Sequence, residues 1–122
     1  MGFDFTEGKT GGQITFEALL DQRNANPPNV TELSNPNAYA YNVTYLNPGI
    51  YEIQFTNKTF DLSKTTVYFG AANDGDYSRL NNIFDALFKD QQRLAIRVLN
   101  IGTNTLVDSA LFQSPIFIRE YP

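Results

Sequence analysis

Residues 38–55 read AYAYNVTYLNPGIYEIQF, and this stretch decides the fold. In its first half, aromatic and branched side chains alternate with small or polar ones, which is the period of a strand with two different faces. Asn47-Pro48-Gly49 then predicts a tight turn, because proline presets φ and glycine accepts a positive φ. Alternation resumes from Ile50 to Phe55. The pattern predicts two antiparallel strands joined as a hairpin.

Similar short runs, separated by turn residues, lie on both sides of this hairpin. The predicted strands cover Gln13–Leu20, Val30–Leu33, Ala38–Leu46, Ile50–Phe55, Thr65–Ala71, Arg93–Ile101, Thr105–Val107 and Pro115–Tyr121. This spacing predicts an all-β fold: an antiparallel β-sandwich, jelly-roll or immunoglobulin-like, with about seven to nine short strands. We expect residues 13–122 to form a single domain and residues 1–12 to form an extended N-terminal arm.

Two positions test this assignment. Residues 77–88 fit an amphipathic helix through Leu80, Phe84 and Leu87, yet the same residues also alternate as a strand. We favour the strand, because all neighbouring runs are strands. Pro115 is expected to open the last strand, because proline does not fit the interior of a central strand.

Composition excludes several kinds of catalytic site. The 122 residues include no histidine and no cysteine. The chain therefore has no Cys–His or Ser–His nucleophile pair, and it has no zinc site of the usual cysteine and histidine kind. Carboxylates remain, but most of them, such as Asp74 and Asp76, lie in predicted turns, where aspartate serves turn geometry. We therefore expect no enzyme, and no catalytic, cofactor-binding or metal-binding residues.

Charge argues against two kinds of partner. The net charge is −4, and the nine basic residues are spread along the chain. No basic cluster is present to neutralise nucleic-acid phosphates or to bind anionic lipids. No apolar run is long enough to cross a bilayer, and residues 1–7 lack the features of a signal peptide. We expect neither nucleic acid nor a membrane as a partner.

Tyr39, Tyr41 and Tyr45 share one face of a predicted strand. An exposed aromatic row stacks on sugar rings or fills a subunit interface, whereas a row packed in the core has the same sequence pattern. Three interpretations stay open: packing in the core or at a sheet edge, a subunit interface, and carbohydrate contact. We favour packing and keep all three tyrosines as candidate interface residues.

The first twelve residues have a different character from the rest. Phe3 and Phe5 alternate, and the glycines at positions 8, 11 and 12 loosen the chain. The segment is either a frayed end or an arm that buries two rings and adds backbone hydrogen bonds to a sheet edge. We favour docking, onto its own domain or a neighbour's, with Phe3 and Phe5 as candidate interface residues.

Five short motifs follow one another along residues 12–122. They are a Leu-Leu strand at Phe16–Leu20, a Val-x-x-Leu element at Val30–Leu33, a Gly-x-Tyr strand at Gly49–Ile53, a Lys-Thr strand entry at Lys64–Val67 and a closing Pro-Ile-x-Ile-Arg-x-Tyr-Pro at Pro115–Pro122. In this order they resemble a family of small β-rich proteins encoded among the virion genes of tailed bacteriophages. Residues 72–92 depart from that resemblance, because they are more polar and charged.

The resemblance implies a non-enzymatic structural protein of a virion: a capsid decoration, head-fibre or tail-associated protein. It implies location in the virion, contacts with other virion proteins, and a homo-oligomer, and it transfers no catalytic residues. The residues themselves leave one alternative open. A carbohydrate-binding or host-adhesion β-sandwich module would use the tyrosine row or the loop at residues 72–80.

Overall fold

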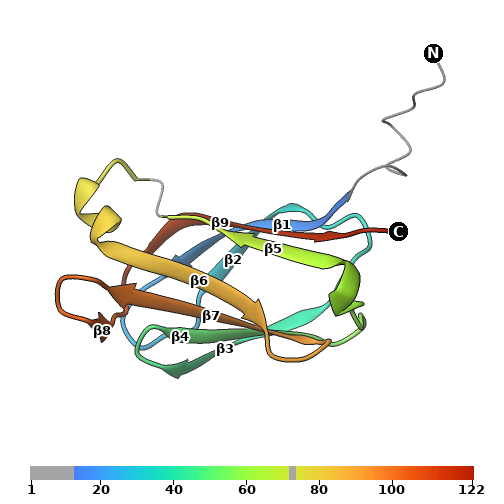
Figure 1. Cartoon of the computed structure of the whole chain (residues 1–122), viewed down its shortest axis with the longest axis horizontal. Helices are drawn as coiled ribbons and strands as arrows, with labels where there is room; N and C mark the ends of the chain where they lie inside the picture. Colours follow the sequence, from blue (N-terminus) through green and yellow to red (C-terminus); the bar gives the residue numbers. More distant parts are fainter. Residues whose placement is uncertain (1–12, 72–73) are drawn as a thin grey trace, which may run out of the picture.

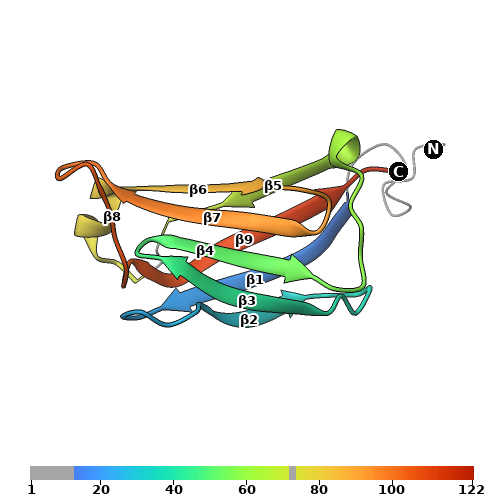
Figure 2. The same cartoon turned by 90° about the horizontal axis from the view of Figure 1, so that it is seen from below.

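The computed structural model describes residues 13–71 and 74–122, which form two antiparallel sheets packed face to face (Figures 1 and 2). Sheet A has the strand order β2-β1-β9-β5, and sheet B has the order β3-β4-β7-β6 with short β8 beside β7. The strands are β1 Gln13–Gln22, β2 Asn29–Ser34, β3 Tyr41–Asn47, β4 Ile50–Phe55, β5 Thr65–Phe69, β6 Asn82–Phe88, β7 Arg93–Asn100, β8 Thr105–Leu106 and β9 Leu111–Glu120. The predicted antiparallel β-sandwich is confirmed, while the predicted arm at residues 1–12 lies outside the described residues.

The predicted central hairpin is confirmed. Tyr45 of β3 lies opposite Tyr51 of β4, and Gly49 in the turn has a φ of 71°. A Cβ atom at Gly49 would lie 2.7 Å from both the backbone N of Val107 and the backbone O of Val98. Glycine is therefore required twice, once for its positive φ and once for the close approach of the neighbouring backbone.

The first strand of this hairpin begins later than predicted. Residues 38–40 are not part of β3, because Ala38 has a φ of 52° and the chain turns there. The Asn35 side chain holds this turn by accepting a hydrogen bond from the backbone N–H of Tyr39 and donating one to its carbonyl. Such local asparagine bonds compete with a sheet ladder, so alternation alone placed the strand start three residues too early.

Residues 77–88 divide into two elements. A 3₁₀ turn, η3, covers Tyr77–Asn81, and Asp76 caps it by accepting hydrogen bonds from the Ser78 N–H and hydroxyl. The strand interpretation is confirmed for β6, in which Phe84 and Phe88 pack against the core. The helical spacing arose because one turn of η3 runs directly into an alternating strand.

The expectation for Pro115 was wrong. Pro115 lies inside β9, which is bordered by β1 on one side and β5 on the other. Its carbonyl accepts a hydrogen bond from the Gly70 N–H, so its nitrogen also points toward β5. β5 ends at Phe69, so Pro115 lies where the hydrogen-bond ladder between β9 and β5 stops. The N–H that proline lacks is therefore missing at the end of that ladder and not inside it. Proline is tolerated there because β9 extends beyond its neighbour.

The core lies between the sheets and follows the alternation. Every second residue of β7, from Leu94 to Val98, is fully buried, as is the predicted row on β4. Three rings, Phe16, Phe55 and Phe60, pack edge to face, with 5.1 Å between the centroids of Phe55 and Phe60. Each such side chain contributes about 1.5–3 kcal/mol by leaving water, so this cluster helps to hold the two sheets together.

Candidate functional site

The tyrosine row faces the core. Tyr39 is 9% exposed, and its ring packs 5.6 Å from that of Phe60, while Tyr41 and Tyr45 are half-buried and pack against the same core. Each hydroxyl has a polar partner: Asn37 donates to Tyr39, and Tyr41 and Tyr45 donate to Glu32 and Asp108. These contacts favour the packing interpretation. The other two candidates, Phe3 and Phe5, lie outside the described residues.

Asp108 anchors the end of the central hairpin. One carboxylate oxygen accepts hydrogen bonds from the Tyr51 hydroxyl and the Gly49 N–H, each at 2.8 Å, and the other accepts one from Tyr45 at 2.5 Å. The hydrogen bond to Asp108 is the main cause that raises the pKa of Tyr45 to about 12. Sequence reasoning missed Asp108, because it lies in a loop far along the chain from its partners.

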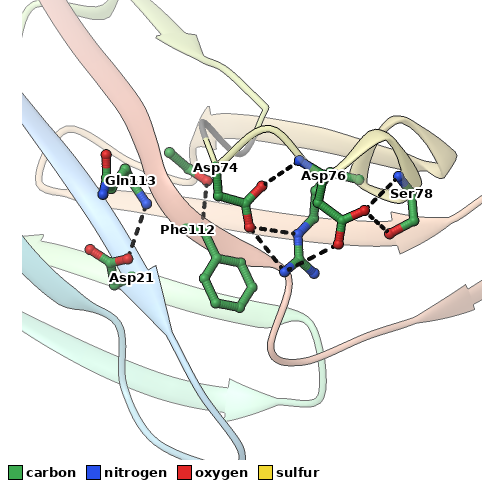
Figure 3. A network of polar contacts seen from close by, with 8 residues as sticks. Asp21, Asp74, Asp76, Ser78, Phe112 and Gln113 are labelled. Atoms are coloured by element: carbon green, nitrogen blue, oxygen red, sulfur yellow. Dashed lines mark hydrogen bonds and ion pairs between the residues drawn. The ribbon is translucent and has the colours of Figure 1, made fainter.

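Residues 74–81 overlap the loop at residues 72–80 that the carbohydrate alternative would use, and their side chains form a polar cluster (Figure 3). The Arg79 guanidinium lies 3.9 Å from the centroid of the Phe112 ring and 3.1 Å from the Asp74 carboxylate. A hydrogen bond from the Ser78 hydroxyl lowers the pKa of Asp76. These acids hold loop geometry and pair with Arg79. Within residues 13–71 and 74–122, no group of three or more acidic side chains forms a metal-binding cluster.

The outer face of sheet B carries aliphatic side chains. We call it the aliphatic face; it consists of Leu46, Ile50, Ile83, Leu87 and Ala95. Leu87 is 59% exposed, and a shallow depression of about 380 Å³ lies beside it. The charges at this face neutralise one another, since Arg97 pairs with Asp85, and Lys89 lies 2.6 Å from Glu52. Such a surface matches a partner that is mainly apolar.

The outer face of sheet A carries aromatic side chains instead. A groove of about 510 Å³, here the aromatic groove, is lined by Thr66, Val67, Tyr68, Phe117, Arg119 and Tyr121. The rings of Tyr68 and Phe117 lie 5.6 Å apart with planes tilted by 31°, and Tyr68 is 56% exposed. Arg119 has no ion-pair partner among the described residues. The groove offers apolar plates beside an uncompensated cation.

Comparison with known proteins adds no relative: no family model, no curated protein and no solved structure matches the chain. Within residues 13–71 and 74–122, no helix is long and apolar enough to span a membrane. The two outer faces and the sequence motifs are therefore the features of this chain that bear on its function.

Proposed function

We propose that the protein is a non-enzymatic structural protein of a bacteriophage virion that acts through protein–protein contacts, with the aliphatic face as its main contact surface. The order of motifs along residues 12–122 supports the virion role. Ile50, Leu87 and Ala95 line one depression and support the mode of action, because exposed apolar surface rimmed by polar residues marks interaction sites.

The aliphatic face suits contact with a second copy of the chain. Leu87 and Ile83 project from the same side of β6, and Ile50 and Ala95 extend the surface across β4 and β7. Because Arg97 and Lys89 already pair with acids of the same face, burying the surface leaves no charge without a partner. A two-fold contact of this face with itself would bury Ile50 and Ala95 on the central strands and Leu87 on the edge strand β6.

Self-association of the purified chain tests the contact surface. We expect sedimentation equilibrium to show a reversible oligomer that Leu87→Lys dissociates, since a lysine buried in an apolar contact must be desolvated. Thr31→Lys is the matched control, because it adds the same charge to exposed β2 of the other sheet. A wild-type chain that stays monomeric at high concentration contradicts the homo-oligomer.

The location of the protein is tested separately. Peptide mass spectrometry of purified phage particles should detect the chain at a defined copy number relative to the major capsid protein. Its absence from particles that are complete and infective would contradict the virion role, whatever the oligomeric state.

One observation favours the carbohydrate alternative. The Tyr68 and Phe117 rings form an exposed plate flanked by Arg119 and the Thr66 hydroxyl, which suits the apolar face and the hydroxyls of a sugar. This alternative predicts saturable glycan binding that Tyr68→Ala abolishes. The core-packed Tyr41, substituted to phenylalanine, serves as the control, because its hydroxyl bonds Glu32 and its ring does not line the groove.

A further inference from the structure

Within residues 13–71 and 74–122, the outer edge of β5 has backbone amides without hydrogen-bond partners. Gly70 donates to the Pro115 carbonyl and Tyr121 donates to the Lys64 carbonyl, so residues 64, 66, 68 and 70 point their backbone groups toward β9. The backbone groups of Val67 and Phe69 therefore point away from the sheet. Among the described residues, no hydrogen bond reaches their amides. Edges of this kind are templates for one more strand.

The same edge borders the aromatic groove. Tyr68 and Thr66 stand on the outer face of β5, next to Phe117 and Arg119 of β9, which lie directly opposite them. A strand added along β5 would cover these side chains with its own. The occupant must therefore supply apolar groups at alternate positions and, near Arg119, a negative charge.

Residues 3–8 read Phe-Asp-Phe-Thr-Glu-Gly and supply both features. Gln13 of β1 and Thr65 of β5 both lie opposite Glu120, so the chain enters β1 at the level where β5 begins. The position beyond β5 is three strand spacings from β1, about 14 Å, which about four extended residues span. Residues 9–12, which include Gly11 and Gly12, provide that length.

We propose that residues 3–8 of the same chain add to the edge of β5 as an antiparallel strand and complete sheet A. Residues 9–12 cross the end of sheet A and place Gly8 opposite Thr65. From there, residues 8 to 3 extend along β5, with Glu7 opposite Thr66 and Phe5 opposite Tyr68. Backbone hydrogen bonds form between Thr6 and Val67. The Phe5 ring covers the plate of Tyr68 and Phe117.

Charge and connectivity support this occupant. In this register Glu7, level with Thr66, lies on the same face as Arg119, which forms no ion pair within the described residues, because Thr66 is opposite Arg119. Attachment through four residues gives the chain's own segment a local concentration on the order of millimolar, which a second copy reaches only in a crowded assembly. The occupant is therefore the chain's own segment.

Disulfide trapping tests this register directly, because the chain has no cysteine. Phe5 and Tyr68 form a non-hydrogen-bonded pair in the proposed register, with Cα atoms about 4.5 Å apart, a separation that a disulfide bridges. We expect Phe5→Cys with Tyr68→Cys to form an intrachain disulfide in dilute solution, seen as a loss of two hydrogens in the intact mass. The control pair, Phe5→Cys with Leu87→Cys, stays reduced.

Two results of this trapping overturn the proposal. A disulfide that forms only between chains assigns the edge to a second copy. A pair that stays reduced under oxidising conditions shows that the segment does not occupy β5.

Hydrogen exchange gives an independent measurement on the full chain. We expect the Val67 and Phe69 amides to be protected and to exchange at least tenfold faster in Thr6→Pro, because proline removes a donor and breaks the added strand. Thr10→Pro, in the crossing, is the matched control and leaves both amides protected. Equal exchange in wild type and Thr6→Pro contradicts the proposal, as does a saccharide that binds the wild-type chain at Tyr68.

Discussion

The two outer faces of this sandwich differ in what they leave unsatisfied. The aliphatic face of sheet B exposes Leu87 and Ile83, and its charges are paired within the same face. The aromatic groove of sheet A stacks Tyr68 on Phe117 and leaves Arg119 without an acidic partner among the described residues. A partner of the aliphatic face therefore needs only apolar surface. A partner of the aromatic groove needs apolar surface, a negative charge and a strand that pairs with β5.

Under the two proposals above, each face takes part in a different kind of recognition. A face without free charge tolerates many apolar partners, whereas a face with an open edge and a cation accepts a segment of one sequence pattern and one direction. The aliphatic face thus suits contacts between copies. The aromatic groove suits a single peptide segment.

The comparison depends on both faces being carried by one cooperative fold, and Gly49→Ala tests that dependence most severely. A Cβ atom there would lie 2.7 Å from two backbone atoms at a φ of 71°. We expect a loss of about 2–4 kcal/mol in the free energy of unfolding, measured by urea denaturation. Gly75→Ala is the control, because it shares a positive φ but has nothing within 4 Å. Equal effects at the two glycines would mean that backbone strain, rather than close packing, dominates.

Matched lysine substitutions sharpen the contrast between the faces themselves. Leu87→Lys should weaken self-association about 30-fold, because it places a charge in the apolar contact, while Tyr68→Lys should change it less than twofold. Sedimentation velocity over a concentration series measures both. If Tyr68→Lys is the more damaging substitution, the roles of the two faces are reversed.

The Asp108 anchor sits beneath the end of sheet B, and Tyr51→Phe tests its contribution. Removing the hydroxyl eliminates one hydrogen bond to the Asp108 carboxylate and should cost about 1 kcal/mol of stability by urea denaturation. Tyr68→Phe, which removes a hydroxyl from the aromatic groove, should change stability by less. Equal losses of stability in the two variants would show that the cost comes from the changed hydration of the hydroxyl and not from its hydrogen bond to Asp108.

Stability against pH distinguishes the hydroxyl anchors from the acidic turns. The Tyr45 pKa rises from 10.0 to about 12 in the folded protein, so the folded state holds its proton more tightly and stability falls as pH rises through 10 to 12. Hydrogen bonds from Ser63 and Ser78 lower the pKa values of Asp61 and Asp76, so their stabilisation is lost below about pH 4.

Between these limits, stability should be flat from about pH 6 to 8, because the chain has no histidine. Thermal denaturation across pH 3–11 measures the whole profile. A transition near neutral pH would identify a strongly perturbed acid.

The smallest effect is expected at the ion pair between Arg97 and Asp85, because both side chains are about half exposed. Arg97→Ala should change the free energy of unfolding by less than about 0.5 kcal/mol, since solvent screens such pairs. Its effect on self-association should be larger, because it leaves Asp85 unpaired within the contact. Denaturation and sedimentation of the same variant compare the two effects.

The alternation of apolar and polar residues predicted much of the fold, because successive side chains of a strand point to opposite faces. The rows on β4 and β7 are buried as expected, and the Asn47-Pro48-Gly49 turn joins β3 to β4. Alternation says nothing about local side-chain bonds, so it predicts a strand from Ala38 although β3 begins at Tyr41. Nor does alternation show which strands become neighbours. Pro115 was therefore expected to open the last strand, although it lies inside β9 and only β5 ends beside it.

The candidate sites were harder to predict, because each depends on which strands become neighbours. Alternation places Tyr41 and Tyr45 on the same face of β3. It shows that this face points inward only once the core side of β3 is known. Tyr68 and Phe117 come from distant strands, and their stacking follows from the pairing of β5 with β9. Asp108 gives no signal at all in the sequence, because its three partners lie on a hairpin formed about sixty residues earlier.

The placement of β9 between β1 and β5 has a consequence for the order of folding. The bond from the Thr15 hydroxyl to the Ile118 carbonyl joins residues 103 positions apart, whereas all of β3, β4, β6 and β7 lie between them. Closing so long a loop is entropically costly, so we expect sheet B to form first as a template and sheet A to close in the rate-limiting step. Until that step, the inner side of sheet B remains open to water and to misassembly.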